Sequence, residues 1–323
     1  MNNILPEKLL EMFASLSRIR RVQLKIEELY HLDEMKTPVH LCLGQEAVSV
    51  GVCAHLKKED HIFSNHRSHG HYLAKGGDLK ALIAELHCKE TGCSKGRGGS
   101  MHLIDTSVGH LGSSSIVGGG ISHAVGAALG SRMLKKQGIS VTFFGDAASE
   151  QGVFFESMSL AKLKNLPVIF ICENNYYSVF SHISARQPNY DISMRAKAFD
   201  IPAQRVDGMS LLEVYEKARE AIDHARAGNG PYLLDCYVQR WRGHAGAGDP
   251  LKEQYRHPDD LDESKIRDPL KDFVSYLKNH NIADDDSLCE INKRIDREIE
   301  EAFDFARKSP LPDVKDLEKY LFS

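Results

Sequence analysis

Residues 141–152, VTFFGDAASEQG, and residues 166–177, LPVIFICENNYY, decide the fold of this chain. Each contains a short apolar run rich in β-branched and aromatic residues, which is typical of a strand buried on both faces. Between the runs, residues 151–164 place apolar side chains on what would be one face of a helix, and Pro167 ends it. The pattern predicts a strand–helix–strand unit, whose two strands must be parallel.

Polar residues follow both predicted strands. Asp146 comes after the first, and Asn174 and Asn175 come after the second. In open parallel sheets the carboxyl ends of the strands are where ligands bind. Mg²⁺ prefers carboxylates and phosphate oxygens, so this edge could hold a diphosphate through a cation, with the following helix presenting its N-terminus to the anion. The alternative is an ordinary turn in which Asp146 caps the helix.

Composition limits the class of protein. The chain has 323 residues, of which 42% are hydrophobic, and strand and helix patterns alternate without a linker-like break, which favours a single domain over residues 1–323. A net charge of -4 argues against a nucleic-acid partner, and neither a membrane-spanning run nor a signal peptide is evident. The seven cysteines include no CxxC pair, which predicts reduced thiols and a cytoplasmic location.

Further elements follow from periodicity. Helices are expected over 6–30, 44–55 and 121–136, and strands over 61–64 and 231–238. The 121–136 helix is rich in small residues, which predicts a place deep in the core or at a subunit contact. Residues 92–120 form a glycine-rich connection with little strand or helix signal, and the chain beyond about residue 262 reads as charged helix. The expected class is α/β, with a mostly parallel sheet flanked by helices.

Several segments carry a family resemblance when they are taken in order. They are HLCLGQEA (residues 40–47), HRSHGHYLAKG (66–76), GRGGSMHL (96–103), SIVGGG (115–120), Gly145-Asp146 with Asn174-Asn175, and RVDGM (205–209). Over essentially its whole length the chain resembles the alpha subunit of the first component of 2-oxo acid and acetoin dehydrogenases. The HRSHGH segment is more similar to the acetoin branch. The resemblance implies a thiamine-diphosphate-binding fold that also binds Mg²⁺.

The resemblance also implies roles for individual residues. Asp146, Asn175 and the backbone carbonyl of Tyr177 would bind the metal. His40 and His244 would be catalytic, and Arg67, whose guanidinium suits diphosphate oxygens, would lie beside His66. His102 would lie near the site or simply anchor the glycine-rich segment. The full cofactor-binding set would be His66, Arg67, Ser115, Val117, Gly145, Asp146, Ala147, Ala148, Asn175, Tyr177 and His244.

This chain departs from the family pattern in places. Ser115 and Ala147 stand where relatives usually have glycine, which puts the shape of those loops in question. His66 replaces a tyrosine that is found in many relatives. Ala245 stands where animal pyruvate enzymes carry a regulatory serine, so control by a kinase at that position is not expected.

The resemblance finally implies a partner and a reaction. The glutamate that activates the cofactor comes from a beta subunit, so we expect an assembly of two alpha and two beta subunits, with a lipoyl acyltransferase as a further partner. The enzyme would decarboxylate a pyruvate-like 2-oxo acid or cleave acetoin and pass the acyl unit to a lipoyl carrier. The alternatives are a thiamine-dependent synthase or decarboxylase of a specialised pathway without a lipoyl partner, and a non-catalytic assembly subunit.

Overall fold

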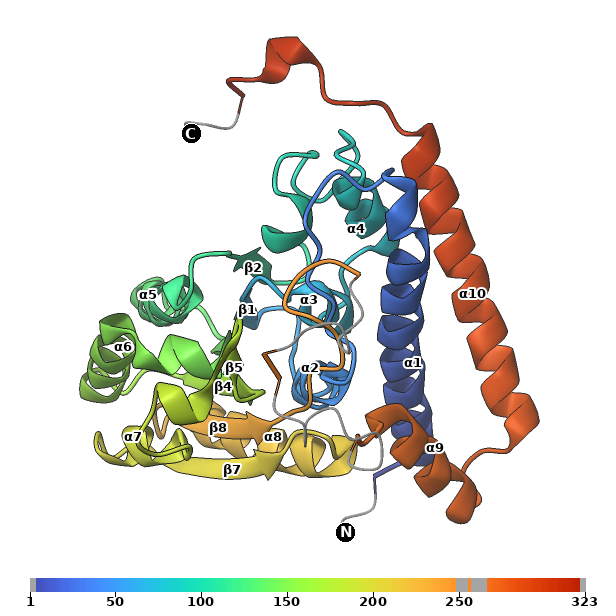
Figure 1. Cartoon of the computed structure of the whole chain (residues 1–323). Helices are drawn as coiled ribbons and strands as arrows, with labels where there is room; N and C mark the ends of the chain where they lie inside the picture. Colours follow the sequence, from blue (N-terminus) through green and yellow to red (C-terminus); the bar gives the residue numbers. More distant parts are fainter. Residues whose placement is uncertain (1–3, 248–254, 257–265, 320–323) are drawn as a thin grey trace.

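A parallel β-sheet forms the centre of the molecule (Figure 1). The computed structural model describes residues 4–247, 255–256 and 266–319. Within these residues the sheet has six strands in the order β2-β1-β3-β4-β8-β7, and every neighbouring pair is parallel. In that order the strands are His110–Ser113, His61–Ser64, Ser140–Gly145, Val168–Asn174, Tyr232–Tyr237 and Ala203–Asp207. The predicted α/β class is confirmed.

The two strands that opened the sequence argument are neighbours at the middle of the sheet. β3 and β4 pair in register from Ser140 with Val168 to Gly145 with Glu173, and α6 (Gly152–Leu163) connects them. Their apolar side chains alternate between the two faces, as strand geometry requires. Val141 and Ile169 belong to the core on one face, and Phe144 and Phe170 to the core on the other. This explains why both runs are apolar throughout.

Helices cover both faces of the sheet, and a further layer stands at one side (Figure 1). Helices α5 (Gly119–Met133), α6 and α7 (Ser193–Lys197) cover one face, and α2 (Glu46–Cys53) and α8 (Leu211–Arg226) cover the other. The side layer forms a third apolar core and consists of α1 (Pro6–Leu29), α3 (His69–Ala74), α4 (Leu79–Leu86), α9 (Pro269–Asn279) and α10 (Asp285–Lys308). In the described part of the chain, no helix is both long and apolar enough to cross a membrane.

A buried ion pair joins this side layer to the sheet. Arg20 of α1 donates to both carboxylate oxygens of Glu46 at the start of α2, and also to Asp268, which caps α9. The Glu46 side chain has no exposed surface, so its charge depends on these donors and on the backbone N–H of Gly44. The guanidinium also lies 4.2 Å from the ring centre of Trp241.

The structure differs from the sequence prediction at the edges of the sheet. The glycine-rich segment 92–120 does contain a strand, β2, which pairs with β1 at the edge of the sheet and has no continuous apolar pattern. The strand β7, at the opposite edge, is likewise half polar. Helix α5 is not deep in the core, because Ser122, His123 and Gly126 on its outer face are exposed. The Gly-Asp-Pro sequence at 248–250, which favours a flexible loop, and the start of the charged tail at 262–265 lie outside the described residues.

Candidate functional site

Asp146 lies where β3 ends, at the carboxyl edge of the sheet. It begins a 3-10 helix, Asp146–Glu150, and α6 starts afterwards at Gly152, within one residue of the predicted start. The carboxylate is buried, and Arg186 donates to its Oδ2 over 2.5 Å. Its Oδ1 is buried and has no hydrogen-bond partner among the described residues. A buried acceptor without a donor is costly, so this oxygen fits a ligand such as a cation.

The two asparagines after β4 have different environments. Asn174 points into the protein, where its amide donates to Asp235 and to the carbonyl of Tyr190. Asn175 instead lines the cavity, with its Oδ1 accepting from the backbone N–H of Tyr177 over 3.0 Å and its Nδ2 donating to Gln45. A carboxamide oxygen accepts two bonds, so Asn175 retains one acceptor position for a ligand. Of the two asparagines, Asn175 is therefore the one that lines the cavity.

Two residues close to Asn175 have a positive φ. A small hairpin, β5 (Tyr177–Ser178) and β6 (Ser181–His182), follows it directly. Tyr176 has φ 65° and Val179, at the hairpin turn, has φ 51°. A branched residue such as valine rarely takes this left-handed conformation, and such strain occurs preferentially at functional sites.

A cavity opens at this edge of the sheet. It encloses about 760 Å³, including the part open to solvent. A Cβ placed on Gly145 would meet no atom within 4 Å, so this wall leaves room for a ligand. Ten of the predicted residues line the cavity, and these are His66, Arg67, Val117, Gly145, Asp146, Ala147, Ala148, Asn175, Tyr177 and His244.

Three histidines from different loops meet beside the cavity. One ring nitrogen from each of His40, His66 and His244 lies within 4.8 Å of the others. Burial, followed by the nearby Arg67, lowers the pKa of His40 to about 3 and of His66 to about 2. The same causes lower the pKa of His244 to about 4. All three imidazoles are neutral near pH 7, so each offers a nitrogen that can accept a proton.

The surroundings of the histidines favour an anion. The Arg67 side chain is fully buried, and it donates to the carbonyls of Leu41 and His244, the latter over 3.1 Å. Burial and the charge of Arg240 lower the pKa of Arg67 to about 9, which leaves it charged at neutral pH. Two guanidinium groups beside three neutral imidazoles would repel a metal cation and attract phosphate oxygens. The arrangement suits a diphosphate opposite the cation site.

A single carboxylate organises the glycine-rich segment. Glu85 is buried and accepts hydrogen bonds from the backbone N–H groups of Ser94, Gly96, Gly98 and Gly99, over 2.8–2.9 Å. His102 follows, and its two ring nitrogens contact the Gly98 carbonyl and the hydroxyl of Ser115. His102 therefore anchors the segment, and Ser115 is exposed and bonded to it instead of lining the cavity.

The departure at Ala147 requires no unusual backbone. Ala147 lies inside the 3-10 helix and is not among the residues with positive φ. Alanine therefore fits where relatives have glycine, and the turn places Asp146 without strain at this position.

Several polar residues that line the cavity were missed by sequence reasoning, among them Gln45, Glu173 and Arg240. Gln45 contacts Asn175, and its Nε2 is buried and has no partner among the described residues. Glu173 connects to the His71 ring at 3.2 Å and to Asn65. Arg240 carries positive charge toward the histidines. Gln45 lies in the HLCLGQEA segment, which carries part of the family resemblance, so its sequence context pointed to the site. Its position next to the start of a helix did not indicate a role in the cavity.

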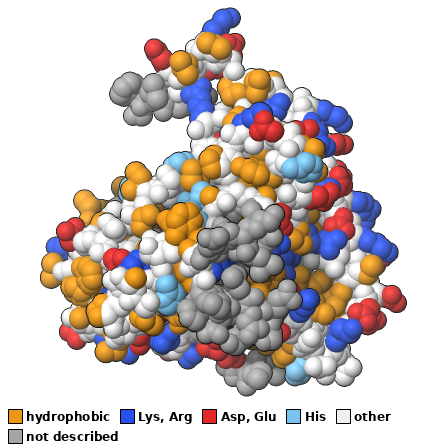
Figure 2. All heavy atoms as spheres, viewed as in Figure 1, with side chains coloured by type: hydrophobic (Ala, Val, Ile, Leu, Met, Phe, Trp, Pro, Cys, Tyr) orange, Lys and Arg blue, Asp and Glu red, His pale blue; other side chains and the backbone are white. Residues whose placement is uncertain are grey.

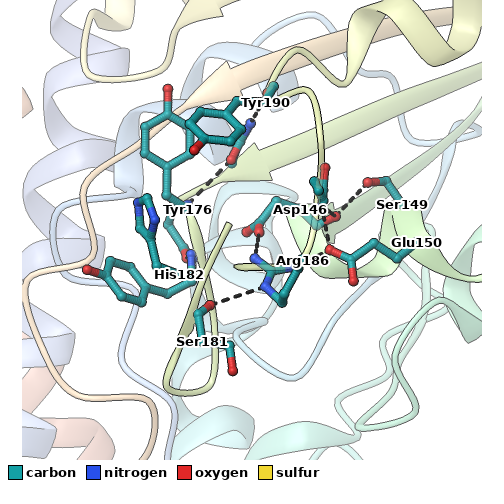
Figure 3. A network of polar contacts seen from close by, with 12 residues as sticks. Asp146, Ser149, Glu150, Tyr176, Ser181, His182, Arg186 and Tyr190 are labelled. Carbon is teal, nitrogen blue, oxygen red and sulfur yellow. Dashed lines mark hydrogen bonds and ion pairs between the residues drawn. The ribbon is translucent and has the colours of Figure 1, made fainter. Parts of the chain in front are cut away.

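The most important missed residue is Arg186, which lies in an irregular segment with no recognisable pattern. Figure 3 shows its guanidinium between Asp146, Glu150 and Ser181.

Comparisons with known proteins identify the family of this chain. Residues 14–315 match the family model described as the dehydrogenase E1 component. The chain is 41% identical to the alpha subunit of acetoin:2,6-dichlorophenolindophenol oxidoreductase from Bacillus subtilis, over 96% of this chain and 92% of that protein. It is 37% identical to the pyruvate dehydrogenase E1 alpha subunit of Porphyra purpurea, over 99% and 94% of the two chains. It is also 37% identical to that of Rhizobium meliloti, over 95% and 88%. The chain belongs to the dehydrogenase E1 component family, as an alpha subunit of the thiamine-diphosphate-dependent type.

Proposed function

We propose that this chain is the alpha subunit of an enzyme that decarboxylates a pyruvate-like 2-oxo acid or cleaves acetoin, and passes the acyl unit to a lipoyl carrier. The observation that carries the proposal is the buried, unpartnered Oδ1 of Asp146 beside Asn175, at the carboxyl edge of a parallel sheet. Family membership identifies the diphosphate that such a site would hold as that of thiamine.

The chain's own residues supply the diphosphate side of the site. Oδ1 of Asp146, Oδ1 of Asn175 and the backbone carbonyl of Tyr177 would hold Mg²⁺, which keeps open positions for phosphate oxygens. Arg67, His66 and His244 would face those oxygens from the opposite side. Gly145, Ala147, Ala148 and Val117 would form the walls, and Ser115 would hold its loop in place through His102.

The histidines are suited to moving protons. His40 and His244 are neutral at pH 7, so each can accept a proton from substrate or cofactor and return it during acyl transfer. Thiamine diphosphate, when bound, supplies the carbanion that attacks a carbonyl and the electron sink for bond cleavage.

A beta subunit would complete the site. We propose an assembly of two alpha and two beta subunits, with the activating glutamate supplied by beta and a lipoyl acyltransferase as the acceptor. Exposed apolar side chains support a partner on this chain, since Met133 and Leu163 of α5 and α6 are each about three-quarters exposed (76% and 77%). Figure 2 shows apolar side chains on the α5–α6 side and dense charge along α10. All seven cysteines are free, which supports the proposed cytoplasmic location.

Reductive acylation of a lipoyl domain tests the proposed reaction. The complex of this chain with its beta subunit would be assayed with pyruvate, branched 2-oxo acids and acetoin in parallel, and turnover with one of them is expected. Asp146→Ala should abolish Mg²⁺-dependent binding of thiamine diphosphate, measured by calorimetry. Unchanged cofactor affinity in that variant would refute the metal site, and no turnover with any substrate would refute the reaction.

A further inference from the structure

A guanidinium group bridges the two chain segments that carry the proposed metal ligands. Arg186 comes from the irregular segment after the β5–β6 hairpin, and its side chain is only 12% exposed. Its Nη2 donates to Oδ2 of Asp146 over 2.5 Å, its Nη1 donates to Glu150, and its Nε donates to the carbonyl of Ser181 over 3.2 Å. Figure 3 shows these three contacts diverging from one side chain.

Each of these partners belongs to a ligand segment. Asp146 and Glu150 are the two ends of the 3-10 helix that follows β3. Ser181 lies on β6 and pairs with Ser178 of β5, the strand that also carries Tyr177. Arg186 therefore links Asp146 to the hairpin that carries Tyr177. A lysine could not make these contacts, because an ammonium lacks the planar fork of a guanidinium.

The hydrogen bond from Arg186 also gives the two carboxylate oxygens of Asp146 different roles. Arg186 occupies Oδ2, and Oδ1 is left buried without a protein partner. A carboxylate held in this way offers one oxygen to a cation and cannot rotate to offer both. Mg²⁺ demands near-ideal octahedral geometry, which a one-oxygen carboxylate suits, whereas Ca²⁺ readily takes both oxygens.

We propose that Arg186 is a positioning residue for the cation: it holds Asp146 in a one-oxygen geometry and so favours Mg²⁺ over Ca²⁺. This inference rests on the proposed function, because it takes Asp146 as a metal ligand. Gln187 braces the arrangement, because it donates to the backbone carbonyl of Asp146 and to Glu150. Arg195 lies further out and donates to Gln187 and Ser149, not to Asp146.

The test compares the affinities of two metals. The complex of the full chain with its beta subunit would be stripped with a chelator, and thiamine diphosphate would be added. Mg²⁺ and Ca²⁺ would then be titrated separately by calorimetry. In Arg186→Gln we expect Mg²⁺ affinity to fall about 10–100-fold, as for other partners of metal-binding side chains. Ca²⁺ affinity should fall less, so the ratio of Ca²⁺ to Mg²⁺ affinity rises.

Arg195→Gln is the matched control. It removes a guanidinium from the same network, but one that contacts Ser149 and Gln187 instead of Asp146. The ratio of Ca²⁺ to Mg²⁺ affinity in Arg195→Gln should equal that of the wild type, even if thermal unfolding shows a loss of stability. A general loosening of the network would change both variants alike and would overturn the proposal.

The remaining outcomes distinguish a failure of this inference from a failure of the proposed function. If Arg186→Gln keeps the wild-type affinities and ratio while Asp146→Asn loses Mg²⁺ binding, Arg186 has no positioning role and the proposed function stands. Tighter Mg²⁺ binding in Arg186→Gln would show that the guanidinium competes with the cation, which also overturns the inference. If Asp146→Asn itself binds Mg²⁺ normally, the proposed function fails. Should Arg186→Gln not fold, Arg186→Lys takes its place, and a wild-type ratio in that variant sinks the idea.

Discussion

Replacing Glu85 with glutamine should loosen the glycine-rich segment that borders the site. Each carboxylate oxygen of Glu85 accepts two backbone N–H groups, with Gly98 and Gly99 at Oε1 and Ser94 and Gly96 at Oε2. A glutamine has one acceptor oxygen and one amide group. In either orientation of the glutamine side chain, its NH₂ group faces two of the four backbone N–H groups. Those two backbone donors then have no acceptor.

The magnitude follows from those two donors. An unsatisfied buried donor costs about 1–3 kcal/mol, and the loop is half-buried, so we expect a loss of about 2–4 kcal/mol. The local opening of the segment should become more frequent by roughly 30-fold or more, since about 1.4 kcal/mol corresponds to a factor of ten. Thiamine diphosphate affinity should fall with it, because His102 and Ser115 depend on the same segment.

Hydrogen exchange followed by mass spectrometry measures this directly. The amides of residues 94–99 should exchange faster in Glu85→Gln, while those of the central strands stay protected. Glu298→Gln is the control, because Glu298 is a surface partner of Arg18, 39% exposed, and such pairs contribute about 0–1 kcal/mol. Unchanged exchange at residues 94–99, or a stability loss below about 1 kcal/mol, would refute the reasoning.

Three other predictions concern stability and thiol reactivity. Burial lowers the pKa of His69 to about 4 and of His110 to about 3, whereas the pKa of a histidine in an unfolded chain is about 6.5. At pH values between the folded and unfolded pKa, the unfolded state therefore binds more protons than the folded state. The contribution of these histidines to the free energy of unfolding should therefore be complete above pH 6.5. It should fall as the pH is lowered from about 6.5 to 4, by about 1 kcal/mol per pH unit for each histidine. A free energy of unfolding that does not change with pH in urea titrations would contradict this. Arg20→Met should cost about 3–5 kcal/mol, because Glu46 would keep a buried charge without its partner, and the double variant with Glu46→Leu should recover much of the loss. Maleimide should label exposed Cys289 in the native protein and leave Cys172 and Cys236, whose pKa burial raises, unlabelled until unfolding; rapid native labelling of either buried thiol would argue against the packing described.

The sequence predicted the centre of the sheet well, for physical reasons. β3 and β4 are apolar on both faces, so their runs stand out, and Asp146 and Asn175 follow from where those runs end. The edge strands β2 and β7 bury little and have no such pattern, so they were not predicted. The organisation of residues 1–323 as a single domain stays a prediction.

Residues brought together by tertiary structure were harder to predict. Arg186 is 40 residues from Asp146, in a segment with no periodicity, and only the folded hairpin brings the two side chains together. The division of roles between Asn174 and Asn175 also needed the structure, because adjacent residues on an extended chain point in opposite directions. His40 and His244 were predicted from family motifs alone, since no local pattern in the sequence links residues so far apart.

The two halves of the cavity differ in how firmly the fold fixes them, and this bears on how such an enzyme changes during evolution. Asp146 and Asn175 leave adjacent strands whose ladder runs in register up to Gly145 and Glu173, so their spacing is inherited with the sheet itself. His40, His66 and His244 come from three separate loops and not from neighbouring strands of the sheet. Substitutions in those loops can therefore reshape the face that meets substrate while the cation edge stays as it is.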